Sequence, residues 1–281
     1  MIVRYKAVVS GDVIEIYEYE KPILSGKDAE NRRRKSDDED DSPEWIKGLS
    51  EGDSDDLSGK YRDDSLSRAR KKIRRLINAN VYKHPSEDGE LYKPVFMTLT
   101  FAENVTDVDL ANKAFKQFIR KLNGHVYGRG RVGLKYVTVI EFQKRGAVHY
   151  HCVFFNLPFI DSGVIASLWG QGFIKVNSMK KRDGTNCDNV GAYVTKYMQK
   201  ELDDERLHGR KCYLVSKGLH QPEEIALDSF GLEKLRASID SAKVYEAQFD
   251  TDYLGMIQYQ QYNLTGLDLK PDFSGLEELA G

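Results

Sequence analysis

The sequence predicts an α+β fold with a central antiparallel β-sheet flanked by helices. Between residues 94 and 215, segments with strand-like patterning alternate with segments of helical period, and two neighbouring strands are joined by a tight turn that pairs them antiparallel. The apolar fraction of 40% is sufficient for a packed core. Outside this centre we expect irregular N- and C-terminal extensions.

The elements follow one another along the chain with recognisable caps and turns. Two short strands are predicted in residues 1–20, around the Ser10-Gly11-Asp12 turn. Further strands are expected at 94–101, 134–142, 148–155, 173–176 and 211–215. Helices are expected at 65–80, from Thr106 or Asp107 to Tyr127 with Leu110, Ala114, Phe118 and Leu122 on one face, from Asp161 to Trp169, and at 189–202. The residues after 215 are expected to be helical or irregular.

The charges are unevenly distributed along the chain. Residues 36–58 hold ten acids and one base, so they carry −9, and the net charge of −2 leaves +7 for the remaining residues. A basic body with an acidic insert is typical of proteins that bind a polyanion. We predict four parts: N-terminal strands at 1–24, an acidic disordered linker at 25–62, the main domain at 63–220 and a C-terminal extension at 221–281.

Several functional classes are disfavoured by what the sequence lacks. The three cysteines form no C-x-x-C pair, which argues against a zinc knuckle or a disulfide framework. No phosphate-binding loop of an ATP-driven motor is present. The start lacks a signal-peptide pattern, and no apolar run reaches membrane-spanning length. We therefore expect a cytoplasmic protein of a bacterial host cell, with no membrane partner.

The segment around residues 139–155 predicts a metal site on a β-hairpin. His149 and His151 alternate with Tyr150, so both imidazoles project from one face of a strand. A three-residue loop with Gly146 at its left-handed position would pair Glu141 with His149. Two imidazoles and one carboxylate suit Mg²⁺, Mn²⁺ or another first-row ion and leave positions open for phosphate oxygens. The alternative is a pair of structural histidines, because H-x-H alone has low specificity.

A second group of functional candidates lies on the predicted helix at 189–202. At 3.6 residues per turn, Tyr193, Lys196, Tyr197 and Lys200 share one stripe. A free phenol has a pKa of about 10, and neighbouring lysines with a metal-bound phosphate favour its phenolate form. The stripe therefore predicts nucleophilic attack on phosphorus. A surface face whose tyrosines pack by their rings is the alternative.

These motifs resemble those of the HUH endonucleases, in particular the replication initiators of rolling-circle plasmids and single-stranded DNA phages. The strand Phe96–Phe101 is similar to the family's first motif, and Tyr193–Tyr197 to its two-tyrosine motif. The His149-Tyr150-His151 segment resembles the metal motif, with Glu141 similar to the third ligand. The resemblance spans about residues 93–220 and includes segments near Trp169 and Cys212.

The resemblance implies a fold, a reaction and partners. It implies an RRM-like palm whose sheet carries the histidines, with Tyr197 as first and Tyr193 as second nucleophile. It implies site-specific nicking of single-stranded or cruciform origin DNA through a 5′-phosphotyrosine, together with a host helicase and polymerase. Tyr150 departs from the motif's usual aliphatic residue, and its hydroxyl needs a partner if it is buried.

Basic residues away from these motifs are candidates for DNA contact. Residues 111–140 contain seven bases and no acid, and residues 65–80 contain six bases and no acid. Two arginines lie in a glycine-rich loop that suits phosphate binding. The candidates are Arg68, Lys71, Lys72, Arg75, Arg129, Arg131, Lys135 and Lys175.

Other functions remain open on the sequence alone. The same constellation serves conjugative relaxases, which usually carry three histidines, and transposases, whose small forms are shorter. A non-catalytic nucleic-acid-binding protein would need neither tyrosine nor metal. A metal-dependent hydrolase that uses water would leave no covalent adduct.

Overall fold

The structure is a computed structural model that describes residues 2–24, 67–179, 187, 189–198, 205–207, 212–251, 253–268 and 271. The chain divides into two compact units, of which one comprises Leu66–Gln221 and the other Met1–Ser65 together with Pro222–Gly281. The predicted acidic linker at 25–62 lies outside the described residues. No helix in the described part of the chain is long and apolar enough to cross a membrane.

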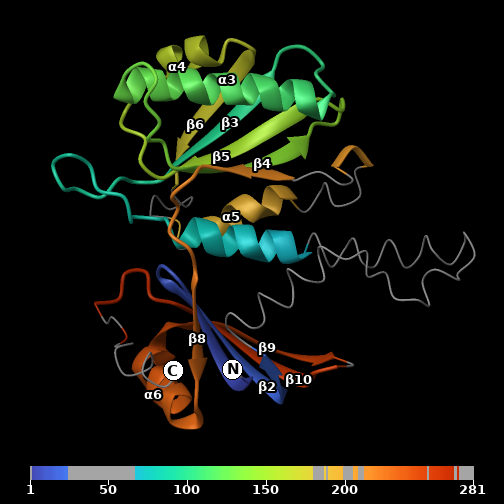
Figure 1. The fold of residues 1–281 in the computed structure, drawn as a ribbon, viewed down its shortest axis with the longest axis vertical. Coiled ribbons are helices and arrows are strands. Elements are labelled where there is room, and N and C mark those ends of the chain that lie inside the picture. Colours follow the sequence, from blue (N-terminus) through green and yellow to red (C-terminus); the bar gives the residue numbers. More distant parts are fainter. Residues whose placement is uncertain are drawn as a thin grey trace, which may run out of the picture. The chain divides into compact units, whose positions relative to one another are not determined.

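The unit Leu66–Gln221 contains an antiparallel five-stranded sheet between two layers of helices (Figure 1). The strand order is β6 (Gly172–Ser178), β3 (Val95–Phe101), β5 (Val148–Phe154), β4 (Tyr136–Phe142) and β7 (Tyr213–Val215). Helices α3 (Val108–Tyr127) and α4 (Ser162–Trp169) cover one face. The helix at 67–78 and α5 (Val190–Thr195) cover the other. The predicted α+β class with a central antiparallel sheet is confirmed.

Helix α3 forms where its cap and apolar period predict. The carboxylate of Asp107 accepts hydrogen bonds from the backbone N–H groups of Asp109 and Leu110. Phe115 and Phe118 are buried against the sheet, but Leu110 is 57% exposed. The expected apolar stripe was therefore wrong at Leu110, because the buried face follows Val108, Ala111, Phe115, Phe118, Ile119 and Leu122.

The side chain of Tyr150 occupies the core between this helix and the sheet. Tyr150 is 0% exposed and its ring stacks on that of Phe115 at 4.8 Å between centroids. Its hydroxyl donates to Oδ1 of Asn112 on α3 at 2.8 Å. The partner that the sequence required for a buried phenol is therefore Asn112.

The tyrosine-bearing helix differs from the expectation in its length. Helix α5 ends at Thr195 and continues as the 3₁₀ turn η1 (Lys196–Met198), while the predicted helix ran to 202. The hydroxyl of Thr195 donates to the carbonyl oxygen of Gly191 at 2.8 Å, a local bond that competes with the regular helical pattern and bends helices. A second 3₁₀ turn, η2, covers Glu205–Leu207.

The other unit is built from both ends of the chain. Its antiparallel sheet has the order β8 (Glu223–Leu227), β1 (Ile2–Ser10), β2 (Val13–Leu24), β10 (Gly255–Asn263) and β9 (Lys243–Thr251). The expectation of irregular extensions was wrong, because β8 pairs with β1 and β10 pairs with β2. Each segment obtains its hydrogen bonds from a strand at the far end of the sequence, so a local pattern could not show the pairing.

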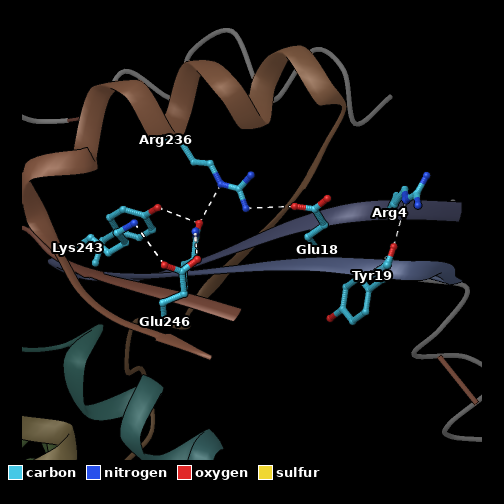
Figure 2. Close-up of polar contacts among 8 residues, drawn as sticks. Arg4, Glu18, Tyr19, Arg236, Lys243 and Glu246 are labelled. Carbon is cyan, nitrogen blue, oxygen red and sulfur yellow. Dashed lines mark hydrogen bonds and ion pairs between the residues drawn. The ribbon is translucent and has the colours of Figure 1, made fainter. Parts of the chain in front are cut away.

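One helix covers this second sheet. Helix α6 (Ser229–Ile239), followed by the 3₁₀ turn η3 (Asp240–Ala242), buries Leu232, Leu235 and Ile239 against Ile14 and Ile16. Arg236 extends from α6 to Oε2 of Glu18 at 3.2 Å and to Oε1 of Gln260 at 2.8 Å (Figure 2). The helix is thus held by an apolar stripe and by one bridging guanidinium.

Candidate metal centre

The hairpin β4–β5 has the register that the sequence predicts. Gly146 adopts φ 86, and its N–H donates to the carbonyl oxygen of Gln143 at 2.7 Å. The N–H of Gln143 donates to the carbonyl oxygen of Ala147 at 2.9 Å. The turn pairs Glu141 with His149. A tight turn with glycine at its left-handed position therefore sets which side chains meet on the sheet.

Three ligand-type side chains converge beside this turn. One donor atom from each of Glu141, His149 and His151 lies within 4.8 Å of the other two. Nδ1 of His149 is 3.5 Å from Oε2 of Glu141, and Nε2 of His151 contacts the same oxygen. All three side chains are 15% exposed or less. The cluster is open enough for a ligand but mostly shielded from water.

The outward nitrogens of the two imidazoles lie against threonines of β3. Nε2 of His149 is 2.9 Å from Oγ1 of Thr100, and Nδ1 of His151 is 3.5 Å from Oγ1 of Thr98. These hydroxyls hold the rings so that Nδ1 of His149 and Nε2 of His151 face Glu141. Partners on the second ring nitrogen are typical of histidines that bind metal.

The surroundings favour neutral imidazole at His149. Burial lowers the pKa of His149, and the neighbouring carboxylate of Glu141 opposes that shift. Neutral imidazole is the form that donates a lone pair to a cation. One carboxylate oxygen and two imidazole nitrogens therefore fit a divalent cation of the Mg²⁺ or Mn²⁺ type, with further coordination positions left for a substrate.

Both tyrosines of α5 and η1 lie at this cluster. The ring of Tyr197 stacks on that of His151 with centroids 3.8 Å apart and planes inclined by 19°. Its hydroxyl donates to the hydroxyl of Tyr193 at 3.3 Å. Phe96 packs against both phenols, edge-on to Tyr193 and stacked on Tyr197. The structure thus brings together the two predicted groups, one from a strand pair and one from a helix.

The surroundings of Tyr197 favour the neutral form of its phenol. Burial raises its pKa above the usual value, and the hydrogen bond to Tyr193 and the charge of Glu141 add to that rise. A cation beside Glu141 would offset the last of these contributions. The phenol therefore depends on added positive charge for its activation.

Helix α5 is attached to the helix at 67–78 by a short polar contact. Oδ1 of Asn78 accepts from the N–H of Gly191 at 2.8 Å, and its Nδ2 donates to Oδ1 of Asn189 at 3.0 Å. Oδ1 of Asn189 also accepts from the N–H of Ala192 and caps α5. A Cβ on Gly191 would lie 2.2 Å from the carbonyl oxygen of Arg74. Gly191 thus allows the close approach that positions both tyrosines.

The remaining site candidates lie at different distances from the cluster. Lys196 is exposed on η1, and Lys200 lies outside the described residues. Lys175 is exposed on β6, opposite Thr98 and therefore on the sheet face that carries His151. The helix at 67–78, which carries Arg68, Lys71, Lys72 and Arg75, packs beside α5.

Two groups of candidates lie away from this face. Arg129 and Arg131 are exposed in the loop before β4, at the end of that strand opposite Glu141. Nζ of Lys135 donates to the carbonyl oxygen of Lys217 at 2.9 Å. These positions could contact DNA only at a distance from the cluster.

Several residues of the site were missed by sequence reasoning. Thr98, Thr100 and Phe96 share one face of β3, and Asn78 positions α5. The alternation Phe96-x-Thr98-x-Thr100 was visible, but its meaning required the pairing of β3 with β5. Asn78 gave no local signal, since its partners are more than 100 residues away along the chain.

Comparison with known proteins places this cluster in a known context. Residues 94–202 match the family of the replication-associated protein ORF2. This range contains the strand β3, the hairpin with Glu141 and both histidines, and the two tyrosines of α5 and η1. The similarity to rolling-circle replication initiators that the sequence motifs predict is therefore confirmed for this part of the chain.

One curated relative is the replication-associated protein ORF2 of Spiroplasma virus 4. It is 26% identical over 167 residues, which cover 50% of this chain and 48% of the relative. The chain thus spans about half the length of the curated relative it matches. No solved structure matches the chain.

Proposed function

We propose that this chain is a rolling-circle replication initiator that nicks one DNA strand and joins itself to the new 5′ end through Tyr197. The observation that carries the proposal is the contact of the Tyr197 ring with the ring of His151 inside the Glu141–His149–His151 cluster. A nucleophile and a metal-binding group must meet at one phosphorus atom for this reaction. The similarity of residues 94–202 to replication-associated proteins supports it.

The proposed cluster separates binding from attack. Glu141, His149 and His151 would hold a Mg²⁺ or Mn²⁺ ion, which when bound polarises a phosphodiester. Thr98 and Thr100 keep the imidazoles oriented. The phenol oxygen of Tyr197 forms a bond to phosphorus as the bond to the 3′ oxygen breaks. The proton lost by the phenol is balanced by the one that the 3′ hydroxyl gains, so the step needs no ATP.

Tyr193 would perform a second transfer. Its hydroxyl lies 3.3 Å from that of Tyr197, so both phenols can approach the same phosphate position. A 5′-phosphotyrosine retains the phosphoester bond, and a second phenol can accept the strand or a 3′ hydroxyl can reclose it. Two tyrosines therefore allow opening of the origin and later closure of the displaced strand. A host helicase and polymerase would copy the strand between these events.

The decisive experiment is detection of the covalent intermediate. The full chain is mixed with Mn²⁺ and labelled single-stranded DNA that covers the replication origin of its own replicon. A protein–DNA band that survives denaturation is expected, and it should disappear with EDTA. Tyr197→Phe should remove most of the band, and Tyr193→Phe combined with Tyr197→Phe should remove all of it.

The alternatives give different results in the same assay. Cleavage without a covalent band, unchanged in the variant that lacks both hydroxyls, would indicate a hydrolase that uses water. Origin binding without cleavage in Mn²⁺ would indicate a non-catalytic DNA-binding protein. Normal cleavage by His151→Ala would refute the assignment of the metal ligands.

A further inference from the structure

A shallow pocket of about 530 Å³ opens beside the metal cluster, and the function proposed above does not use it. It is formed by the ends of β3 and β6 and by the β4–β5 turn, and its lining residues are Thr100, Phe101, Ala102, Gln143, Lys144, Arg145 and Phe173. Thr100 is shared with the cluster, since its hydroxyl lies 2.9 Å from Nε2 of His149. The pocket is thus a direct continuation of the cluster along the sheet.

The wall of this pocket contains an aromatic ring in line with the metal ligands. Glu141 pairs with His149, His149 with Thr100, and Thr100 with Phe173, so the four residues form one row across four strands. Cross-strand partners project from the same face. At a strand spacing of about 4.8 Å, the Cα atom of Phe173 lies about 10 Å from that of His149. This separation suits two neighbouring groups of one extended ligand.

The position of Phe173 is fixed by its surroundings, although its side chain is 72% exposed. The preceding Gly172 adopts φ 151, and a Cβ there would lie 2.4 Å from the backbone nitrogen of Ala102. The indole N–H of Trp169 donates to the carbonyl oxygen of Thr100 at 3.1 Å. β6 is therefore held tightly against β3, and the ring of Phe173 is presented to solvent on a rigid strand.

The opposite wall carries positive charge. Arg145 donates from Nε to Oε1 of Gln143 at 3.0 Å and from Nη1 to the carbonyl oxygen of Ala102 at 3.0 Å, which fixes the guanidinium in place. Lys144 adds an exposed ammonium group. No acidic residue lines the pocket within the described part of the chain. The combination of an exposed ring and two cations suits a base together with a phosphate.

We propose that this pocket is a nucleotide subsite, in which the base next to the attacked phosphate stacks on Phe173 while its own phosphate lies against Lys144 and Arg145. The inference rests on the proposed function in taking single-stranded DNA as the substrate. The subsite is not selective for sequence, because every base offers a face for stacking. Its role is to position the strand so that the scissile phosphate reaches the metal cluster.

The test measures DNA binding without cleavage. Full-length protein in EDTA is titrated with a fluorescent oligothymidylate, and Phe173→Ala is compared with wild type. Loss of one base stack should weaken binding by roughly 5- to 150-fold. Phe173→Tyr keeps the ring and should bind like wild type. Phe159→Ala is the matched control, because Phe159 is 96% exposed but lines no part of the pocket.

Two further measurements separate stacking from a general surface effect. When the base that meets Phe173 is removed by an abasic position in the oligothymidylate, Phe173→Ala should no longer reduce affinity. Lys144→Ala should weaken binding and reduce its salt dependence by about one counterion. Equal affinity of wild type and Phe173→Ala for the intact oligothymidylate would overturn the subsite.

The subsite and the proposed function fail in different ways. If a covalent adduct forms at the origin but Phe173→Ala binds DNA normally, the subsite is wrong and the strand transfer stands. If Phe173 behaves as expected but no adduct forms with any metal, the subsite stands as a DNA-binding element and the strand transfer is wrong.

Discussion

The ring of Tyr197 lies almost parallel to the imidazole of His151, with 3.8 Å between the ring centroids. This contact joins two parts of the chain that are 46 positions apart, since one residue belongs to the hairpin strand β5 and the other to the turn η1. It has two separable consequences. The stack contributes to stability through ring contact, while the hydroxyl contributes only a hydrogen bond to Tyr193.

Substitutions at Tyr197 should therefore separate structure from chemistry. Tyr197→Phe keeps the stack, so the free energy of unfolding should fall by no more than about 1 kcal/mol, the contribution of one hydrogen bond. Tyr197→Ala loses the stack and should cost about 1–3 kcal/mol. Both variants should lose the Tyr197 adduct. Urea unfolding beside the adduct assay checks this, and equal destabilisation by the two variants would show that the ring contact is not what stabilises the site.

Divalent cations should stabilise the folded chain through the cluster. A ligand that binds only the folded state at 100 times its Kd adds about 2.7 kcal/mol. Mn²⁺ should therefore raise the thermal midpoint of wild type, and EDTA should reverse the rise. Glu141→Gln preserves the shape of the side chain but removes its charge, so the rise should be lost or strongly reduced. Glu103→Gln, at an exposed acid outside the cluster, should respond to Mn²⁺ like wild type.

Gly191 should be required for the placement of both tyrosines. In Gly191→Ala, the new Cβ would meet the carbonyl oxygen of Arg74 at 2.2 Å, so α5 must shift away from the helix at 67–78. We expect a loss of about 1–3 kcal/mol in unfolding free energy and a strong loss of adduct formation, with Mn²⁺ binding retained. Gly124→Ala in α3 is the control, since its Cβ meets nothing within 4 Å. It should be neutral or slightly stabilising.

The sequence was sufficient for those parts of the site that depend on local geometry. The register of Glu141 with His149 follows from a three-residue turn and a glycine at its left-handed position. The proximity of Tyr193 and Tyr197 follows from the helical period. Both were predictable because each is determined within a dozen residues.

Features that depend on long-range pairing were not predictable in this way. The threonines behind the histidines require β3 to lie beside β5, and the contact of Asn78 with Gly191 requires two distant helices to meet. The second sheet joins β1 and β2 to β8 and β10 from the other end of the chain. A pattern of apolar residues shows that a strand exists but not which strand it pairs with.

The buried pair of Tyr150 and Asn112 should behave as a coupled unit. Asn112→Ala leaves the Tyr150 hydroxyl without its partner in the core and should cost about 1–3 kcal/mol. Tyr150→Phe leaves only the Asn112 amide, which is partly exposed and can turn to water, so it should cost about 0.5–1.5 kcal/mol. The double variant should cost less than the sum of the two. Strict additivity in urea unfolding would contradict the hydrogen bond.

Acidification should destabilise the unit Leu66–Gln221 through His84, which is 8% exposed and whose Nε2 lies 3.0 Å from Oδ1 of Asn80. Burial lowers the pKa of His84, and the neighbouring His220 and Lys135 lower it further. The unfolded chain, with a histidine pKa of about 6.5, then binds the proton more readily than the folded chain. The contribution of His84 to stability is therefore complete above pH 6.5 and is lost as the pH falls through the lower folded value.

The matching variant is His84→Gln, whose amide can still donate to Asn80 but does not titrate. Its free energy of unfolding, measured in EDTA at a series of pH values, should decline less than that of wild type below about pH 6.5. EDTA keeps metal binding out of the comparison, and His149 contributes equally to both proteins. His125→Gln, at an exposed position of α3, should follow the wild-type curve. If His84→Gln and wild type lose stability in parallel on acidification, protonation of His84 is not what weakens this unit.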